Sequence, residues 1–208
     1  MKWILESKYW NDYVIELPET DFSHPLVRTV TSELFSDIQT DVEKAETAFI
    51  FVRDQISHSF DIQGSHVTCK ASEVLQFKEG ICYAKTNLLA ALLRSQGIPT
   101  GFCYQRLVLF EKPEDGYSIH ALNAIYLASL QKWIRVDARG NKPGVNAQFS
   151  TEKEQLAFPI READGEYDDP VIYAKPHPKT TATLTAHDHP MVMYKHHLPD
   201  RLDNKDYF

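Results

Sequence analysis

The sequence predicts an α+β fold, in which one apolar helix is followed by an antiparallel sheet. Leucines and alanines recur with helical spacing between residues 82 and 96. Three strand-like segments come next, at 101–110, 119–127 and 133–138, and they are rich in aromatic and β-branched residues or alternate in polarity. Because only a short connection joins the last two segments, we expect them to pair as an antiparallel hairpin.

The segments before residue 82 are expected to form a supporting layer. Residues 3–7 and 12–17 have strand composition, and Pro25 fits the first position of a short helix over 25–35. A longer helix should begin at Thr40, because Thr40 and Glu43 have the spacing of a capping box. Its apolar stripe is interpreted as core, and consists of Val42, Ala45, Phe49, Val52 and Ile56.

The helix that starts near Cys82 has well-marked ends. Gly97 suits a left-handed C-terminal position and Pro99 blocks continuation, so the helix should stop near residue 96. At its other end, Gly80 allows close approach of the backbone just before Cys82. A thiol at a helix N-terminus lies near the positive end of the helix dipole and near free backbone N–H groups, which favour the thiolate. Cys82 is therefore a candidate nucleophile.

A histidine and an aspartate on the predicted hairpin can complete a catalytic triad. With a two-residue turn at 128–129, His120 and Asp137 lie directly opposite each other on one face of the sheet. A longer turn shifts the match by one or two positions, which still leaves the two residues near the diagonal. A carboxylate on one ring nitrogen fixes the tautomer, which leaves the other nitrogen free to take the thiol proton. Each residue alone has an ordinary explanation, as a buried thiol, a surface histidine or a turn aspartate. Cys69 and Cys103 are expected to be ordinary thiols, because neither precedes a helix start.

These motifs together carry a family resemblance. The runs 71–75 (ASEVL), 80–84 (GICYA) and 88–99 (LLAALLRSQGIP), followed by His120-Ala121 and the segment 133–137, resemble the bacterial and archaeal transglutaminase-like superfamily. The resemblance covers roughly residues 40–140. It implies a papain-like core with the nucleophile on the central helix, and acyl transfer through a thioester on Cys82, His120 and Asp137. The backbone N–H of Cys82 is a natural oxyanion donor, and Tyr83 and His66 are no better than their neighbours as a second one.

The resemblance also divides the chain. Residues 1–39 would support the core, residues 40–157 would form the transglutaminase-like catalytic core, and residues 158–208 would form a loop-rich C-terminal extension that can belong to the same domain. The extension has several X-Pro pairs, and its last eleven residues are highly charged and expected to be disordered. Its short histidine clusters, 187–189 and 196–197, lack a ligand geometry, so we expect no metal and no other cofactor.

The predicted function is thiol-dependent acyl transfer on amide bonds of peptides or proteins, by a cysteine peptidase or amidase or by a transglutaminase. The alternative is a non-catalytic protein- or peptide-binding module of the same fold, with an idle cysteine. A net charge of −7 without a basic stripe argues against nucleic acid as a partner. The first apolar run is too short for a signal peptide, so we expect a cytoplasmic protein without membrane contact. Nothing in the sequence indicates an oligomeric state.

Overall fold

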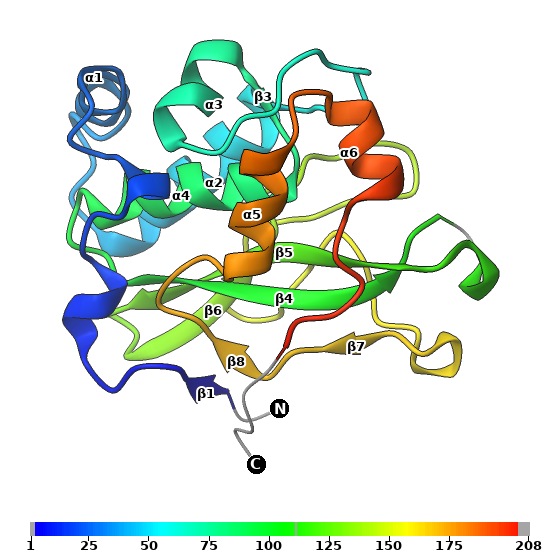
Figure 1. The fold of residues 1–208 in the computed structure, drawn as a ribbon. Coiled ribbons are helices and arrows are strands. Elements are labelled where there is room, and N and C mark those ends of the chain that lie inside the picture. The colour runs from blue at the N-terminus through cyan, green and yellow to red at the C-terminus, as the bar shows by residue number, and fades with distance from the viewer. Residues whose placement is uncertain (1–2, 111, 204–208) are drawn as a thin grey trace.

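A four-stranded antiparallel sheet with a helix against one face forms the centre of the molecule (Figure 1). The structure is a computed structural model that describes residues 3–110 and 112–203. The strand order is β6-β5-β4-β7. The strands are β4 (Thr100–Val108), β5 (Tyr117–Leu127), β6 (Lys132–Val136) and β7 (Tyr167–Asp168). The mixture of helices with an antiparallel sheet confirms the predicted α+β class.

Helix α4 (Cys82–Arg94) is the central helix, and all 13 of its residues are buried. It lies between the sheet and an outer layer of helices (Figure 1). A helix that is covered on all sides needs apolar or small residues around its whole circumference, and its leucines and alanines supply them. Gly97 has the predicted left-handed backbone, with φ +69°.

The outer layer contains three helices, of which the sequence predicted the first two. They are α1 (Pro25–Leu34), α2 (Asp41–Gln55) and α3 (Ala71–Phe77). Thr40 caps α2 as predicted, since its side chain accepts a hydrogen bond from the Glu43 N–H at 3.2 Å. Two short parallel strands, β2 (Ser57–His58) and β3 (Glu79–Gly80), connect this layer to the start of α4.

The predicted strand at 12–17 is wrong. The chain there forms two 3-10 turns, Trp10–Tyr13 and Pro18–Thr20, and the predicted strand at 3–7 is reduced to β1 (Ile4–Leu5). In place of a strand ladder, Tyr13 is anchored individually in a 3-10 turn. Its ring is buried, and its hydroxyl donates to the Ile172 carbonyl at 3.2 Å.

The C-terminal extension is more regular than the sequence suggested. It forms β8 (Val171–Ile172), which pairs in parallel with β1, and two helices, α5 (Pro178–Ala186) and α6 (Pro190–His196). Both helices begin with proline, so two of the X-Pro pairs, His177-Pro178 and His189-Pro190, are helix starts and not loops. Further 3-10 turns span Pro113–Asp115 and Glu162–Asp164.

Residues 199–202 lie against the body of the protein. The Ile119 N–H on β5 donates to the Pro199 carbonyl at 2.8 Å, and Leu202 is buried. Residues 204–208 of the segment expected to be disordered lie outside the described residues. Among the described helices, none has the length and apolar character that crossing a bilayer requires.

The turn of the β5–β6 hairpin is longer than two residues. It spans four residues, 128–131, and Asn123 pairs with Val136. Extending this register places Asp137 opposite Leu122, so Asp137 and His120 lie on the diagonal, as expected for a turn longer than two residues. The difference is two residues, and a shift of two keeps every side chain on its original face. Asp137 therefore remains on the same face as His120, on the diagonal.

Candidate active site

Cys82 is the first residue of α4, and the chain before it explains that position. Lys78 adopts a left-handed backbone with φ +56° and ends α3, after which β3 leads directly into the new helix. Gly80 is needed for close packing, because a Cβ there would lie 2.9 Å from the Thr68 hydroxyl and 3.0 Å from the Ala84 side chain. Cys82 itself is buried, with 6% of its surface exposed, and that surface faces a cleft.

His120 lies on β5 beside the thiol, at the centre of the sheet. Its Nε2 is 2.8 Å from Asp137 Oδ2, and its ring meets the ring of Phe158 edge-on at a centroid distance of 5.2 Å. Burial alone would lower the pKa of His120. The negative charges of Asp137 and Cys82, with hydrogen bonding to both side chains, outweigh burial and raise the pKa of His120 well above its usual range. The imidazolium is therefore the favoured form at neutral pH.

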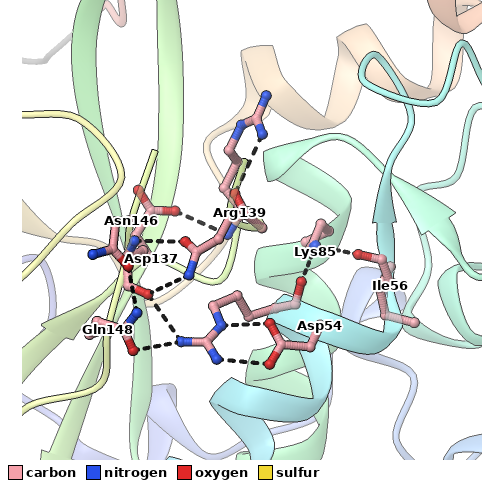
Figure 2. A network of polar contacts seen from close by, with 11 residues as sticks. Asp54, Ile56, Lys85, Asp137, Arg139, Asn146 and Gln148 are labelled. Carbon is pink, nitrogen blue, oxygen red and sulfur yellow. Dashed lines mark hydrogen bonds and ion pairs between the residues drawn. The ribbon is translucent and has the colours of Figure 1, made fainter. Parts of the chain in front are cut away.

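Asp137 follows the last residue of β6 and is completely buried. Its Oδ1 accepts from the Arg139 N–H at 3.1 Å, and its Oδ2 accepts from the Ala157 N–H at 3.1 Å in addition to contacting His120. Burial would raise the pKa of Asp137, but the charge of His120 and these hydrogen bonds lower it below its usual value. A fixed carboxylate thus orients the imidazole. Figure 2 shows Asp137 within a network of polar contacts.

Helices α2 and α4 are connected just below the site by a buried lysine. Lys85 lies one turn after Cys82 and donates to the Ile56 carbonyl at 2.5 Å and to the Arg53 carbonyl at 3.4 Å (Figure 2). These carbonyls lie at the C-terminal end of α2, where a cation is favoured. Burial, together with the nearby charge of Arg139, lowers the pKa of Lys85 to about 7.

The cleft beside Cys82 has a volume of about 550 Å³. Its walls come from segments far apart in the chain, including the C-terminal extension. Apolar side chains make up most of it, with His58, Ser118 and a few charged groups at intervals. The lining residues include Phe60, Leu107, Phe110, Phe158, Tyr194 and Leu198, and the charged ones are Arg139, Lys142, Arg161 and Glu166.

An ion-pair cluster holds one edge of this cleft. Arg139 forms a two-pronged pair with Asp61, with one N–O distance of 2.9 Å, and Lys142 Nζ lies 2.6 Å from the same carboxylate. The two cations lower the pKa of Asp61 to about 2, against burial, which would raise it. Next to this cluster, the ring of Tyr194 from α6 stacks on Phe60 at a centroid distance of 4.1 Å.

The structure brings Cys82, His120 and Asp137 together, as the sequence predicted, and excludes two suggested oxyanion donors. His66 stacks on Phe77 and binds Glu79 through Nδ1 at 2.6 Å, and Tyr83 donates to the Ile119 carbonyl at 2.7 Å. Neither lines the cleft. Cys69 and Cys103 are free thiols that do not line it either, and burial raises the pKa of each to about 12.

Sequence reasoning missed the cleft residues that arrive from distant segments. His58 and Tyr194 both line the cleft beside Cys82. His58 is in a two-residue strand, which has no periodicity to recognise, and Tyr194 is in a helix that was interpreted as a loop. Among the residues with defined placement, no three histidine, cysteine or acidic side chains are grouped so that they could hold a metal ion.

Comparison with models of known protein families finds a match over the central part of the chain. The model of the transglutaminase-like superfamily matches residues 28–138, which is more than half of the 208 residues. The chain belongs to the transglutaminase-like superfamily. The match begins in α1 and ends just past Asp137, so it contains Cys82, His120 and Asp137.

Two solved structures are similar to this chain at low sequence identity. A candidate cysteine protease from Cytophaga hutchinsonii is 16% identical, with a TM-score of 0.50, and the match covers 64% of this chain and 43% of that one. A structure described as a TGase is 17% identical, with a TM-score of 0.40, and covers 64% of this chain and 35% of that one. The chain thus spans less than half the length of either protein. No curated protein matches the sequence.

Proposed function

We propose that this protein is a thiol-dependent acyl-transfer enzyme that acts on amide bonds of peptides or proteins through a thioester on Cys82. The observation that carries the proposal is the position of His120, which contacts the Cys82 thiol and the fully buried Asp137 together. Membership of a superfamily that contains such enzymes supports it. The apolar cleft of about 550 Å³ beside the thiol offers room for several residues of a peptide.

The proposed mechanism has two halves. His120 already holds the thiol proton in the resting site, and the Cys82 thiolate attacks the amide carbonyl carbon while the oxygen gains negative charge. The tetrahedral species then collapses, the C–N bond breaks, and the imidazolium of His120 protonates the leaving amine. Asp137 holds the ring in the required tautomer throughout. The resulting thioester reacts with water, as in a peptidase or amidase, or with a primary amine, as in a transglutaminase.

The test is to replace the nucleophile and follow both outcomes. Wild-type protein and Cys82→Ala are incubated with a mixture of peptides and a primary-amine probe such as dansylcadaverine, and products are identified by mass spectrometry. We expect cleavage, deamidation or amine incorporation with the wild type and none with C82A. Cys69→Ser is the matched control, because Cys69 does not line the cleft, and it should retain activity.

Two outcomes would count against the proposal. Turnover retained by C82A would remove Cys82 from the mechanism. Absence of turnover together with tight peptide binding by the wild type would favour a binding module with an idle cysteine.

A further inference from the structure

A second histidine, His58, lines the cleft that the Cys82 thiol faces, and the proposed mechanism has not used it. His58 is the last residue of β2, where its Cα pairs with Gly80, two residues before Cys82. The pairing continues through the Ser59 N–H, which donates to the Gly80 carbonyl at 3.3 Å. His58 and Cys82 therefore come from adjacent backbone segments, and both line the same cleft.

The ring of His58 is neutral at physiological pH. Only 5% of the residue is exposed, and Tyr194 packs edge-on against the ring at a centroid distance of 5.8 Å. Burial lowers the pKa of His58 well below its usual range, and the charge of Arg139 adds to this effect. Asp61, whose charge raises the pKa of His58 against burial, is already bound by Arg139 and Lys142.

The surroundings of the ring indicate which nitrogen carries the proton. Nδ1 is buried and has no hydrogen-bond partner in the described part of the chain. A buried N–H without a partner is rarer and costlier than a buried acceptor without one, so the neutral ring favours a bare Nδ1 and a proton on Nε2. With Nδ1 closed off by protein, Nε2 is the nitrogen that the cleft can reach.

We propose that the Nε2–H of His58 is the second donor of the oxyanion hole, next to the backbone N–H of Cys82. The inference rests on the proposed function. When the thiolate adds to the carbonyl carbon, the π electrons of the C=O bond move to oxygen, and two aimed donors stabilise that charge without reorganising. When the oxyanion collapses, the C=O bond is restored and the amine departs with the proton from His120. His58 itself exchanges no proton.

Two histidines then serve opposite purposes because their surroundings differ. His120 has a buried carboxylate partner and is held as a cation, so it can donate a proton. His58 has no carboxylate of its own and stays neutral, so it donates a hydrogen bond and does not add a second positive charge beside the first. The carboxylate beside His120 favours proton transfer there, and the burial of His58 without such a partner favours hydrogen bonding by a neutral ring.

The test compares two reactions of the same thiol. Acetylation of Cys82 by p-nitrophenyl acetate passes through an oxyanion, whereas alkylation by iodoacetamide displaces iodide and forms none. Both rates are measured at Cys82 by mass spectrometry of the intact protein, for the wild type, His58→Phe and His58→Gln. A synthetic peptide of residues 78–86 provides the ratio of the two rates without a folded site.

We expect the ratio of acetylation to alkylation in the wild type to exceed that of the peptide, and to fall about 10²–10³-fold in H58F. The alkylation rate of H58F should stay near that of the wild type, which also shows that the site is folded. H58Q restores an N–H donor and should recover part of the ratio. If H58F does not fold, His58→Leu and H58Q make the same comparison.

The results separate this inference from the proposed function. A ratio that is the same in the wild type and H58F, or equal in the wild type and the peptide, would overturn the role of His58. If Cys82 in the wild type alkylates no faster than in His120→Ala, the ion pair itself is absent. In that case the proposed function fails, and the oxyanion role fails with it.

Discussion

At the scale of single residues, the carboxylate of Asp137 is held by more hydrogen bonds than the side chains of His120 and Cys82 are. Asp137 accepts hydrogen bonds from two backbone N–H groups and contacts His120, with none of its surface exposed. Backbone donors cannot rotate away as side chains can, so the carboxylate cannot follow the imidazole. The imidazole must therefore adopt the orientation that Asp137 sets, and this orientation points its other nitrogen at the thiol.

Replacing this carboxylate by its amide should separate orientation from charge. In Asp137→Asn the shape is kept, but the negative charge that raises the pKa of His120 is lost, and the wrong tautomer becomes available. We expect the pKa of His120, followed by NMR of its ring, to fall, and acetylation of Cys82 near pH 7 to slow on the order of 10³-fold. An unchanged His120 titration would show that Asp137 does not control the ring.

At the scale of elements, helix α4 is fixed to α2 by a single buried cation. Lys85 binds carbonyls at the end of α2, and only 1% of the residue is exposed. Because its folded pKa is about 7 and its unfolded pKa is near 10.4, the unfolded chain binds more protons between these values. The free energy of unfolding that depends on Lys85 therefore rises with pH across that window. Below about pH 7 the buried charge of Lys85 destabilises the folded state most.

This linkage can be measured by difference. We expect the free energy of unfolding of the wild type, relative to Lys85→Met, to increase between pH 7 and 10 by at most ~1.4 kcal/mol per pH unit. Urea unfolding at several pH values provides the comparison. Lys175→Met, at an exposed position, should follow the wild type. A wild-type minus K85M difference that does not change with pH would mean that Lys85 keeps its proton throughout.

The elements that the sequence predicted correctly are those with local signals. The apolar period of α4, the caps of α1 and α2 and the alternation of β5 each depend on residues within a few positions of one another. The order of Cys82, His120 and Asp137 could likewise be predicted. His120 and Asp137 stay on one face with the four-residue turn, because strand faces repeat every two residues.

What could not be predicted depends on contacts between distant segments. His58 becomes a cleft residue because β2 pairs with β3, and Tyr194 because α6 folds back over Phe60. Tyr13 lies in a 3-10 turn and not in a strand, and its hydroxyl donates to the carbonyl of Ile172, far along the chain. None of these partners lies within the window in which a pattern can be recognised.

At the scale of the whole molecule, the C-terminal extension completes the cleft. Helix α6 contributes Tyr194 to its wall and is held by Met193, which is 1% exposed. We expect Met193→Ala to lower the free energy of unfolding by about 2–4 kcal/mol, and to increase access of bulky thiol reagents to Cys82. Val192→Ala on the same helix is the control, because Val192 is 49% exposed and its truncation should change stability by less than about 0.5 kcal/mol.

Chemical denaturation and the rate of Cys82 labelling by a large maleimide measure the two effects. If M193A were destabilised without faster labelling, α6 would not control access to the thiol. If labelling accelerated equally in V192A, the change would reflect the helix as a whole and not its anchor.

The same extension determines the order in which a growing chain acquires its parts. A nascent chain that has emerged to Ala157 already contains the thiol, the imidazole, the carboxylate and the amide that fixes it. It still lacks the wall from α6, the Pro199 carbonyl that pairs with Ile119, and the β8 partner of β1. At ordinary translation speeds the interval is roughly 2–8 s. During synthesis, the chain therefore holds the thiol of Cys82 for seconds before it can form the cleft that this thiol faces.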